Sequence, residues 1–260
     1  MLLVIDIGNT NTVIGIYEGR KLIRNWRIRT ERNTTEDELC VLLNSLFSAS
    51  GIRFQDLDRT VISCVVPPVV RHYDAFCRKY LSRQPHWVDA ASTAGMPILY
   101  TNPAEVGADR IVNAVAAYEQ YRTSLIIIDF GTATTFDVIS EKGEYIGGAI
   151  TPGIMISSEA LFMNASKLPR VDLLTPPAAV IGRDTAGSIK SGIIYGYAGL
   201  VDGMVKRIAK EMGGVPKVIA TGGLAGLIHK VSETIEIVDP DLTLEGLRII
   251  SERIQGLHKA

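Results

Sequence analysis

The chain has 260 residues, with 27 Lys and Arg against 28 Asp and Glu, so its formal net charge is −1. This balance excludes a protein that binds nucleic acid or an anionic membrane mainly through its net charge. It favours a small-molecule partner. The length suits two domains of about 120 residues each better than one core.

The cysteines and the N-terminus indicate the compartment. Cys40, Cys64 and Cys77 are odd in number and lack metal-ligand spacing, so we expect buried thiols in a reducing cytoplasm instead of a disulfide framework. The apolar N-terminal run is interrupted at Asp6, far short of a signal peptide or a membrane span. We therefore expect a cytoplasmic protein with no membrane partner.

Apolar runs and turn residues predict the elements of the first half. Strands are expected at 2–6, 12–17 and 22–29, as an antiparallel meander with a turn at 17–20. A helix over 35–50 follows, with Thr34 or Thr35 as its cap and Glu38 in capping-box spacing after Thr35. The remaining expected elements are a strand at 61–66, a helix at 68–82 beginning on Pro68, a short strand at 86–88 and a long helix at 103–121.

The second half repeats the plan of the first. Its expected strands and helices are strands at 125–129, 134–139 and 144–150, helices at 155–164 and 183–212, and a strand at 217–221. No low-complexity linker separates the halves. The sequence therefore predicts domains at 1–121 and 122–260, joined at the end of a helix.

One pattern occurs in both halves, 123 positions apart. Asp6 and Asp129 each end an apolar strand and are followed by a turn with Gly8 or Gly131 and small hydroxyl or amide residues. A buried carboxylate is costly unless it is paired or holds a cation, while turn N–H groups and hydroxyls suit an anion. A single copy would also fit a hairpin whose Asp satisfies turn groups. Two copies at domain spacing favour a phosphate with its metal, bound in a cleft between two similar domains.

Two glycine-rich segments extend this pattern. Residues 218–226 run from a strand through Gly222 and Gly223 into a helix, a geometry that lets backbone approach a flat ligand or a phosphate. Residues 147–153 are similar, and a hairpin with a tight turn explains them equally well. The sequence has no Gly-x-x-x-x-Gly-Lys-Ser/Thr motif, which excludes a P-loop mechanism.

Together these segments resemble the two phosphate motifs and the adenosine motif of the superfamily of actin, sugar kinases and heat-shock chaperones. Within it, the chain closely resembles the type III pantothenate kinases. The matching segments are residues 6–12, 100–103, 107–110, 129–134, 147–153, 168–169 and 181–185, with Gly192 and Gly196. Cys64 departs from the family, whose strand often has Ser there; we expect altered packing and retained function.

The resemblance implies an α/β fold of two similar ribonuclease H-like domains, each with a mixed sheet flanked by helices, and an ATP cleft between them (the actin-like ATPase superfamily). It implies transfer of the γ-phosphate of ATP to the primary hydroxyl of pantothenate, giving 4′-phosphopantothenate, the first step of coenzyme A biosynthesis. Mg²⁺ with ATP, a monovalent cation (K⁺ or NH₄⁺) and a homodimer are implied as well.

Residue roles follow from the motifs and the resemblance. Asp6 is suited to holding Mg²⁺ directly or through water, and the turn after it to cradling phosphate oxygens. The residues expected to bind ATP are Asp6, Ile7, Gly8, Asn9, Thr10, Asn11, Thr12, Val13 and Thr132. Near Asp129 the resemblance places the monovalent cation; a carboxylate capped by Thr hydroxyls and turn amides would explain that residue too.

Asp109 is the expected general base, and Arg110 beside it would help to keep the carboxylate ionised. On sequence alone, this pair also fits a helix N-terminal charge with a surface ion pair, and the resemblance favours the base. The residues expected to bind pantothenate are Tyr100, Gly107, Ala108, Asp109, Arg110 and Thr185.

Thr185 would reach pantothenate across a dimer interface according to the resemblance, although alone it fits a helix cap. The apolar, Gly-bearing stretch 192–201 fits a buried helix or a subunit seam equally well, and the resemblance favours the seam. The histidines at 72, 86, 229 and 258 lack a nucleophile or metal pattern and are expected to be structural.

Two other functions remain open at this stage. An actin-like or chaperone-like ATPase would move a partner surface, but the chain has no room for an added substrate or polymerisation domain. A transcriptional accessory protein is the second, because the Bvg accessory factor belongs to the same family. The near-neutral charge disfavours direct DNA binding.

Overall fold

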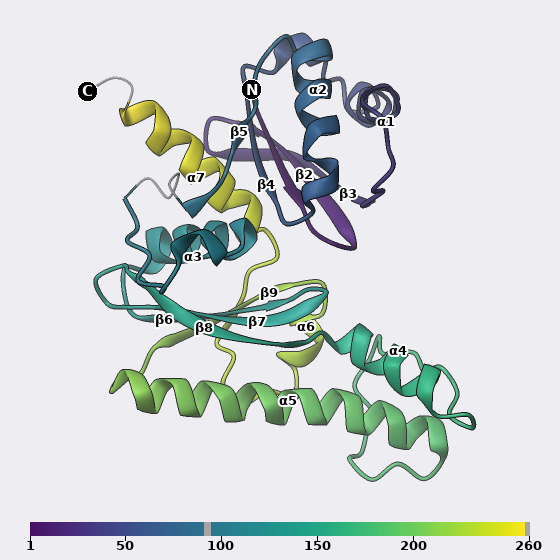
Figure 1. Ribbon diagram of the computed structural model, residues 1–260. Helices are drawn as coiled ribbons and strands as arrows, with labels where there is room; N and C mark the ends of the chain where they lie inside the picture. The colour runs from purple at the N-terminus through teal and green to yellow at the C-terminus, as the bar shows by residue number, and fades with distance from the viewer. Residues whose placement is uncertain (91–94, 258–260) are drawn as a thin grey trace. The chain divides into compact units, whose positions relative to one another are not determined.

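The computed structural model describes residues 1–90 and 95–257, which form two compact units (Figure 1). The first unit is Met1–Ala116 together with the C-terminal helix α7 (Leu242–Leu257), and the second is Ala117–Asp241. This division differs from the expected one at 121/122. The boundary lies within helix α3 (Ala108–Tyr121), and α7 belongs to the first unit because it packs on strands of the first sheet.

A five-stranded mixed sheet forms the centre of the first unit. Its strands are β1 (Leu2–Ile7), β2 (Asn11–Glu18), β3 (Lys21–Arg29), β4 (Arg59–Cys64) and β5 (His86–Trp87). They lie in the order β3-β2-β1-β4-β5. The first three strands are antiparallel, as the predicted meander requires, and β1, β4 and β5 run parallel.

The two faces of this sheet are covered by different helices. Helices α1 (Glu36–Ser48) and α2 (Val70–Tyr80) pack on one face, where Leu3, Ile5 and Ile7 join one buried cluster with side chains of both helices. Since side chains alternate along a strand, Val4 and Asp6 point to the other face. Helix α7 covers that face: a Cβ built on Gly15 would lie 2.9 Å from Val4 Cγ2 and 3.1 Å from Leu244 Cδ1.

The second unit repeats the sheet. Its strands are β6 (Leu125–Phe130), β7 (Ala133–Ile139), β8 (Tyr145–Pro152), β9 (Lys217–Gly222) and β10 (Ile237–Val238). Their order, β8-β7-β6-β9-β10, and their directions match those of the first sheet strand for strand. The duplication predicted from two short motifs is therefore a duplication of whole sheets.

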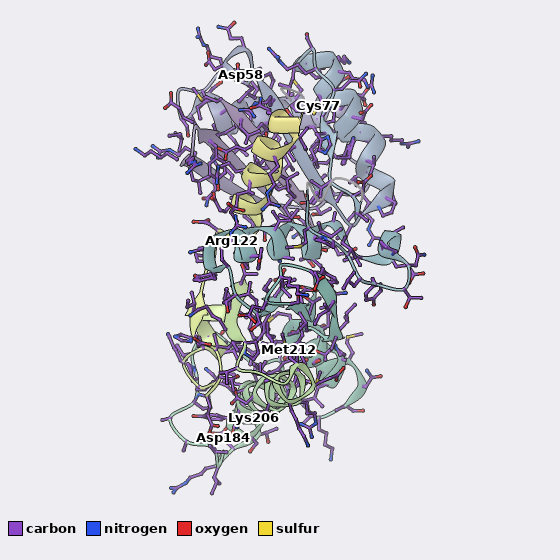
Figure 2. All side chains as sticks on the ribbon, turned by 90° about the vertical axis from the view of Figure 1, so that its left-hand side faces the viewer. Asp58, Cys77, Arg122, Asp184, Lys206 and Met212 are labelled. Carbon is purple, nitrogen blue, oxygen red and sulfur yellow. The ribbon has the colours of Figure 1, made fainter. Side chains whose placement is uncertain are left out.

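A long helix, α5 (Thr185–Met212), runs along one face of the second sheet (Figure 1). Its Ile194 and Val201 are buried in one cluster with Ile126, Ile128 and Phe136 of the strands. The short helices α4 (Ile154–Asn164) and α6 (Ala225–Ile228) complete the unit. Figure 2 labels Asp184, which precedes α5 and caps it by accepting a hydrogen bond from the Gly187 N–H at 2.7 Å.

Local signals predicted most boundaries. The capping box of α1 is confirmed, because the Glu38 N–H donates to Thr35 Oγ1 and the Thr35 N–H donates to Glu38 Oε2. The expected helix at 68–82 is shorter: Pro67–Val69 form a 3₁₀ turn and α2 ends at Tyr80. The expected helix at 103–121 is also broken, into a 3₁₀ turn at Pro103–Glu105 and α3 from Ala108.

Helix α7 and strand β10 were missed. The apolar spacing of Leu244, Leu247 and Ile250 is typical of a helix with one buried face, so the signal for α7 was present. Strand β10 has only two residues, which is too short for a periodicity signal.

Candidate active site

Asp6 stands near the C-terminal end of β1, opposite Ser63 on the parallel strand β4. The Ser63 hydroxyl donates a hydrogen bond of 2.7 Å to Asp6 Oδ1. Because a buried carboxylate needs donors, this contact fixes one oxygen and leaves the other for a ligand. Ser63 was not predicted as a site residue; its only signal was its place three residues before the end of the 61–66 strand.

Asp109 lies in the first turn of α3, in the same unit as Asp6. Its Oδ1 accepts a hydrogen bond of 2.8 Å from the Arg110 N–H. A Cβ built on Gly107 would lie 2.6 Å from the same oxygen, closer than real atoms approach. Gly107 is thus required for the carboxylate to fold back over the start of the helix, a reason different from the substrate approach that we expected of it.

The pKa values of both carboxylates are raised, and the charge of Asp109 contributes to the shift of Asp6. Burial, followed by the negative charge of Asp109, raises the pKa of Asp6 from 3.8 to about 7, against the opposing effects of Ser63 and Arg27. Burial also raises the pKa of Asp109, and it outweighs the hydrogen bond and the charge of Arg110 that act in the other direction. Arg110 therefore works as expected but does not dominate. Two such carboxylates, close together and costly to ionise, fit a cation.

Helix α7 holds α3 in this position. A Cβ on Gly246 of α7 would lie 2.1 Å from the carbonyl oxygen of Val112, so the two helices cross with backbone almost in contact. One residue pair beside the crossing, Thr243 and Asn113, is joined by a hydrogen bond of 2.7 Å from Thr243 Oγ1. Because Val112 is one turn from Asp109, this crossing sets where the carboxylate lies relative to β1.

Hydrogen bonds hold the turn after Asp6 in place. The Gly8 N–H donates to the Asn11 carbonyl at 3.0 Å, and Thr30 Oγ1 at the end of β3 donates to the Gly8 carbonyl at 2.7 Å. Since the Thr30 proton is used there, the Thr12 hydroxyl is the donor in its 2.9 Å contact with Thr30. Thr30 is a second residue that the sequence did not reveal.

The expected ATP-binding residues of this turn differ in accessibility. Asn9, Thr10 and Asn11 are exposed, as a phosphate-binding turn requires, whereas Ile7 and Thr12 are fully buried. The Ile7 side chain belongs to the core, so only its backbone could serve a ligand. Gly8 and Val13 are half-buried.

The second copy of the pattern is built in the same way. Asp129 lies opposite Thr221 on β9, as Asp6 lies opposite Ser63 on β4. The Gly131 N–H donates to the Ala133 carbonyl at 3.0 Å, which matches the bond of Gly8 in the first copy. Thr132 is exposed at this turn.

Two glycines pack against this second turn. Gly222, with φ of +91°, lies so close to Asp129 that a Cβ would be 2.5 Å from Oδ1. Gly153 lies against the turn backbone, where a Cβ would be 2.2 Å from the Thr132 carbonyl oxygen. Both glycines are therefore needed for internal packing, whatever they do for a ligand.

Among residues 1–90 and 95–257, no group of three or more His, Cys, Asp or Glu side chains could hold a metal ion by itself. Within the same described ranges, no helix is long and apolar enough to cross a membrane.

Comparison with known proteins assigns the family. The family model for type III pantothenate kinase matches residues 2–207. A type III pantothenate kinase of Desulfosudis oleivorans is 67% identical over 250 residues, covering 96% of this chain and 98% of that protein. The chain belongs to the type III pantothenate kinase family.

Solved structures with low identity show the same fold. A Campylobacter jejuni protein described as a Baf family transcriptional activator has a TM-score of 0.61 at 18% identity, covering 98% of this chain and 99% of that one. The inorganic polyphosphate/ATP-glucomannokinase of an Arthrobacter species has a TM-score of 0.50 at 14% identity, covering 97% and 98%. The two-domain fold predicted for the sugar kinase and actin superfamily is thereby confirmed.

The remaining site residues that family resemblance predicted lie in three places. Tyr100 is half-buried, shortly before Asn102, whose side chain caps the 3₁₀ turn leading to Gly107. Ala108 and Arg110 are buried at the start of α3. Thr185 is exposed as the first residue of α5, and its neighbour Asp184, not Thr185, is the cap. Cys64 lies opposite Ile7, and its Sγ contacts the backbone of Val66.

The raised pKa of Asp6 predicts how stability depends on pH. The folded protein binds this proton more tightly than the unfolded chain, so the free energy of unfolding falls as pH rises from about 4 to about 7. In metal-free buffer, wild type should unfold at a higher temperature near pH 6 than near pH 8. Asp6→Asn should reduce this difference, because its amide does not ionise.

Asp37→Asn, on the exposed face of α1, is the matched control and should keep the wild-type difference. Asp109→Asn should reduce the difference in part, since it removes the charge that raises the pKa of Asp6. Equal pH dependence in wild type and Asp6→Asn would show that Asp6 is ionised throughout this range.

Proposed function

We propose that the chain transfers the γ-phosphate of ATP to the primary hydroxyl of pantothenate, giving 4′-phosphopantothenate, the first step of coenzyme A biosynthesis. The observation that carries this proposal is the pairing of Asp6 and Asp109 in one unit of a chain from this family. One carboxylate adjoins a turn suited to phosphate, and the other is a buried base. Phosphoryl transfer needs little more than an oriented nucleophile and neutralised charge.

Asp109 acts as the general base. The hydroxyl oxygen of pantothenate forms the new bond to the γ-phosphorus while the bond to the β,γ-bridging oxygen breaks and ADP leaves. The hydroxyl proton passes to the Asp109 carboxylate. Because burial raises its pKa, this carboxylate is a stronger proton acceptor than an exposed aspartate. Gly107, Ala108 and Arg110 position the substrate around it, with Tyr100 as an amphipathic wall.

Asp6 and residues 7–13 hold the phosphates of ATP. A magnesium ion at Asp6, bound directly or through water, would supply the positive charge that phosphoryl transfer requires. Thr132 would contact ATP, and Asp129 would hold the monovalent cation, K⁺ or NH₄⁺. The two acids are related by the duplication of the fold, but their surroundings differ: Asp6 has Asp109 near it, and Asp129 packs against Gly222.

The reaction is proposed to occur in the cytoplasm, where the three free cysteines stay reduced. A transcriptional accessory role, or a chaperone-like or actin-like ATPase, remains the alternative function. A coupled assay for ADP formation, with and without pantothenate and with and without K⁺, separates them. ADP formation that depends on pantothenate supports the kinase. ATP hydrolysis at the same rate with and without pantothenate contradicts it.

The first catalytic prediction concerns Asp109→Asn. This change removes the proton acceptor and leaves the phosphate turn intact, so turnover should fall about 10²–10⁴-fold while ATP binding stays near normal. Steady-state kinetics at saturating substrates, with ATP binding measured separately, test it. If turnover stays above about a third of wild type, the substitution raises the activation free energy by less than about 0.7 kcal/mol. That result would reject Asp109 as the general base. Asp37→Asn is again the matched control.

A second prediction separates the two cations. Asp6→Asn should raise the Mg²⁺ and ATP concentrations needed for half-maximal rate, whereas Asp129→Asn should mainly weaken activation by K⁺ or NH₄⁺. Each cation is titrated in turn for both variants, at fixed concentrations of the other. Identical Mg²⁺ and K⁺ profiles for the two variants would contradict the division of roles.

We also propose that the enzyme is a homodimer whose site includes Thr185 of the neighbouring subunit. Helix α5 supports this with its two faces. Ile194, Tyr197 and Ala198 are buried in the core of the second unit, while the other face carries exposed Gly192, Gly196 and Gly199. A Cβ built on any of these three glycines would meet nothing within 4 Å. A second helix could therefore approach this face closely, so the stretch 192–201 can be a buried helix on one side and a subunit seam on the other.

Mixing inactive chains tests the shared site. Asp109→Asn and Thr185→Arg chains, each inactive alone, should regain about a quarter of wild-type activity after subunit exchange, because half of the dimers are mixed and each has one intact site. Asp6→Asn mixed with Asp109→Asn is the control, since both residues lie in one unit and should not complement. Sedimentation measures the oligomer, and a fully active monomer would reject the proposal.

A further inference from the structure

A cavity of about 450 Å³ lies in the first unit, at the end of the sheet away from Asp6. It is lined by the first residues of β4, by the segment between α2 and β5, and by the last turns of α7. Arg59 opens β4 opposite Leu2, whereas Ser63 faces Asp6 four residues later. At about 3.3 Å a residue, Arg59 lies roughly 13 Å along β4 from Ser63, and Val61, which also lines the cavity, lies between them.

Two guanidinium groups line the cavity. Arg59 Nη1 donates a hydrogen bond of 3.0 Å to Ser251 Oγ, and Arg83 Nη1 donates one of 3.0 Å to the carbonyl of Asp58. Within residues 1–90 and 95–257, neither forms an ion pair with a carboxylate. A guanidinium has five N–H donors, so each keeps donors that these contacts do not use.

The nearest acid does not cancel this charge. Asp58, labelled in Figure 2, belongs to the lining, but its Oδ2 is paired with the N-terminal amino group of Met1 at 2.6 Å. That hydrogen bond and charge, followed by the charges of Arg83 and Arg59, lower the pKa of Asp58. Counting the amino group, three positive charges surround one negative charge. The cavity is therefore positive at neutral pH and suits an anion.

The rest of the lining indicates the kind of anion. Val61 and Ile254 supply apolar surface, and the Gln84 and Gln255 amides supply neutral donors and acceptors. The volume is within the range of small-molecule sites and far exceeds that of a bare inorganic anion. The ligand should thus have an oxyanion group at one end and a partly apolar body.

We propose that this cavity is a binding site for an organic anion of metabolite size that carries a carboxylate or a phosphate. Arg59 and Arg83 hold the oxyanion by charge-assisted hydrogen bonds, which are stronger than neutral ones and can be bidentate. Val61 and Ile254 contact the body of the ligand. The site is separate from Asp6 and Asp109, and it does not depend on the proposed kinase reaction.

Binding of two probes to the full chain tests the proposal. Citrate represents carboxylates and pyrophosphate represents phosphates, each titrated in magnesium-free buffer with calorimetry and with NMR of the arginine Nε–H groups. At least one probe should bind at millimolar concentration or below and shift the Arg59 and Arg83 signals. Which probe binds more tightly identifies the preferred oxyanion.

Arg59→Gln and Arg83→Gln should each weaken binding of that probe about tenfold or more. Arg24→Gln is the matched control, because Arg24 is an exposed arginine of β3 in the same unit and its side chain donates only to the Ile23 carbonyl. Arg83 is exposed, so its variant should fold even if loss of the Arg59–Ser251 bond unfolds the other. Equal weakening in Arg24→Gln, or no shift of either signal, would overturn the proposal.

Discussion

The site depends on keeping two carboxylates close together in a place where ionisation is costly. Asp6 is brought by β1 and Asp109 by α3, and burial raises the pKa of both. Separate contacts stabilise this arrangement: Ser63 donates to Asp6, and the Arg110 N–H donates to Asp109. None of these contacts places α3 itself. That is done by the crossing at Gly246, where backbone meets backbone and any side chain would push the helices apart.

The two sheets repeat one plan but place different residues around its aspartate. In each sheet the central strand has an aspartate one residue before its end, and this aspartate lies opposite a hydroxyl residue of the parallel neighbour, Ser63 or Thr221. The difference lies in what surrounds the carboxylate. Asp6 has a second carboxylate near it, whereas Asp129 packs against the backbone of Gly222. Duplication thus supplied two similar turns, and the residues around the two aspartates differ.

Sequence reasoning found the strands other than β10, the duplication and the two aspartates, because apolar runs of strand length and a repeated motif are local signals. It could not find Ser63 or Thr30, since each matters only through a partner 57 or 22 positions away. Sequence also could not reveal the packing at Gly107, because the atom that excludes a side chain there belongs to the folded Asp109. The helix was predicted at 103–121, which is too long, because the break between Glu105 and Ala108 lies beside the same contact of Gly107 with the Asp109 carboxylate.

Helix α7 connects the two ends of the first sheet. Gly246 lies at the crossing with α3, and Ile254, eight residues on, lines the arginine cavity. At about 1.5 Å a residue, the two points are roughly 12 Å apart on one rigid element. A ligand in the cavity can alter the position of Asp109 only if it binds one position of α7 more tightly than another. The fold therefore gives the cavity a physical route to Asp109, through α7 and α3, and a ligand indifferent to the position of α7 would bind without changing the rate.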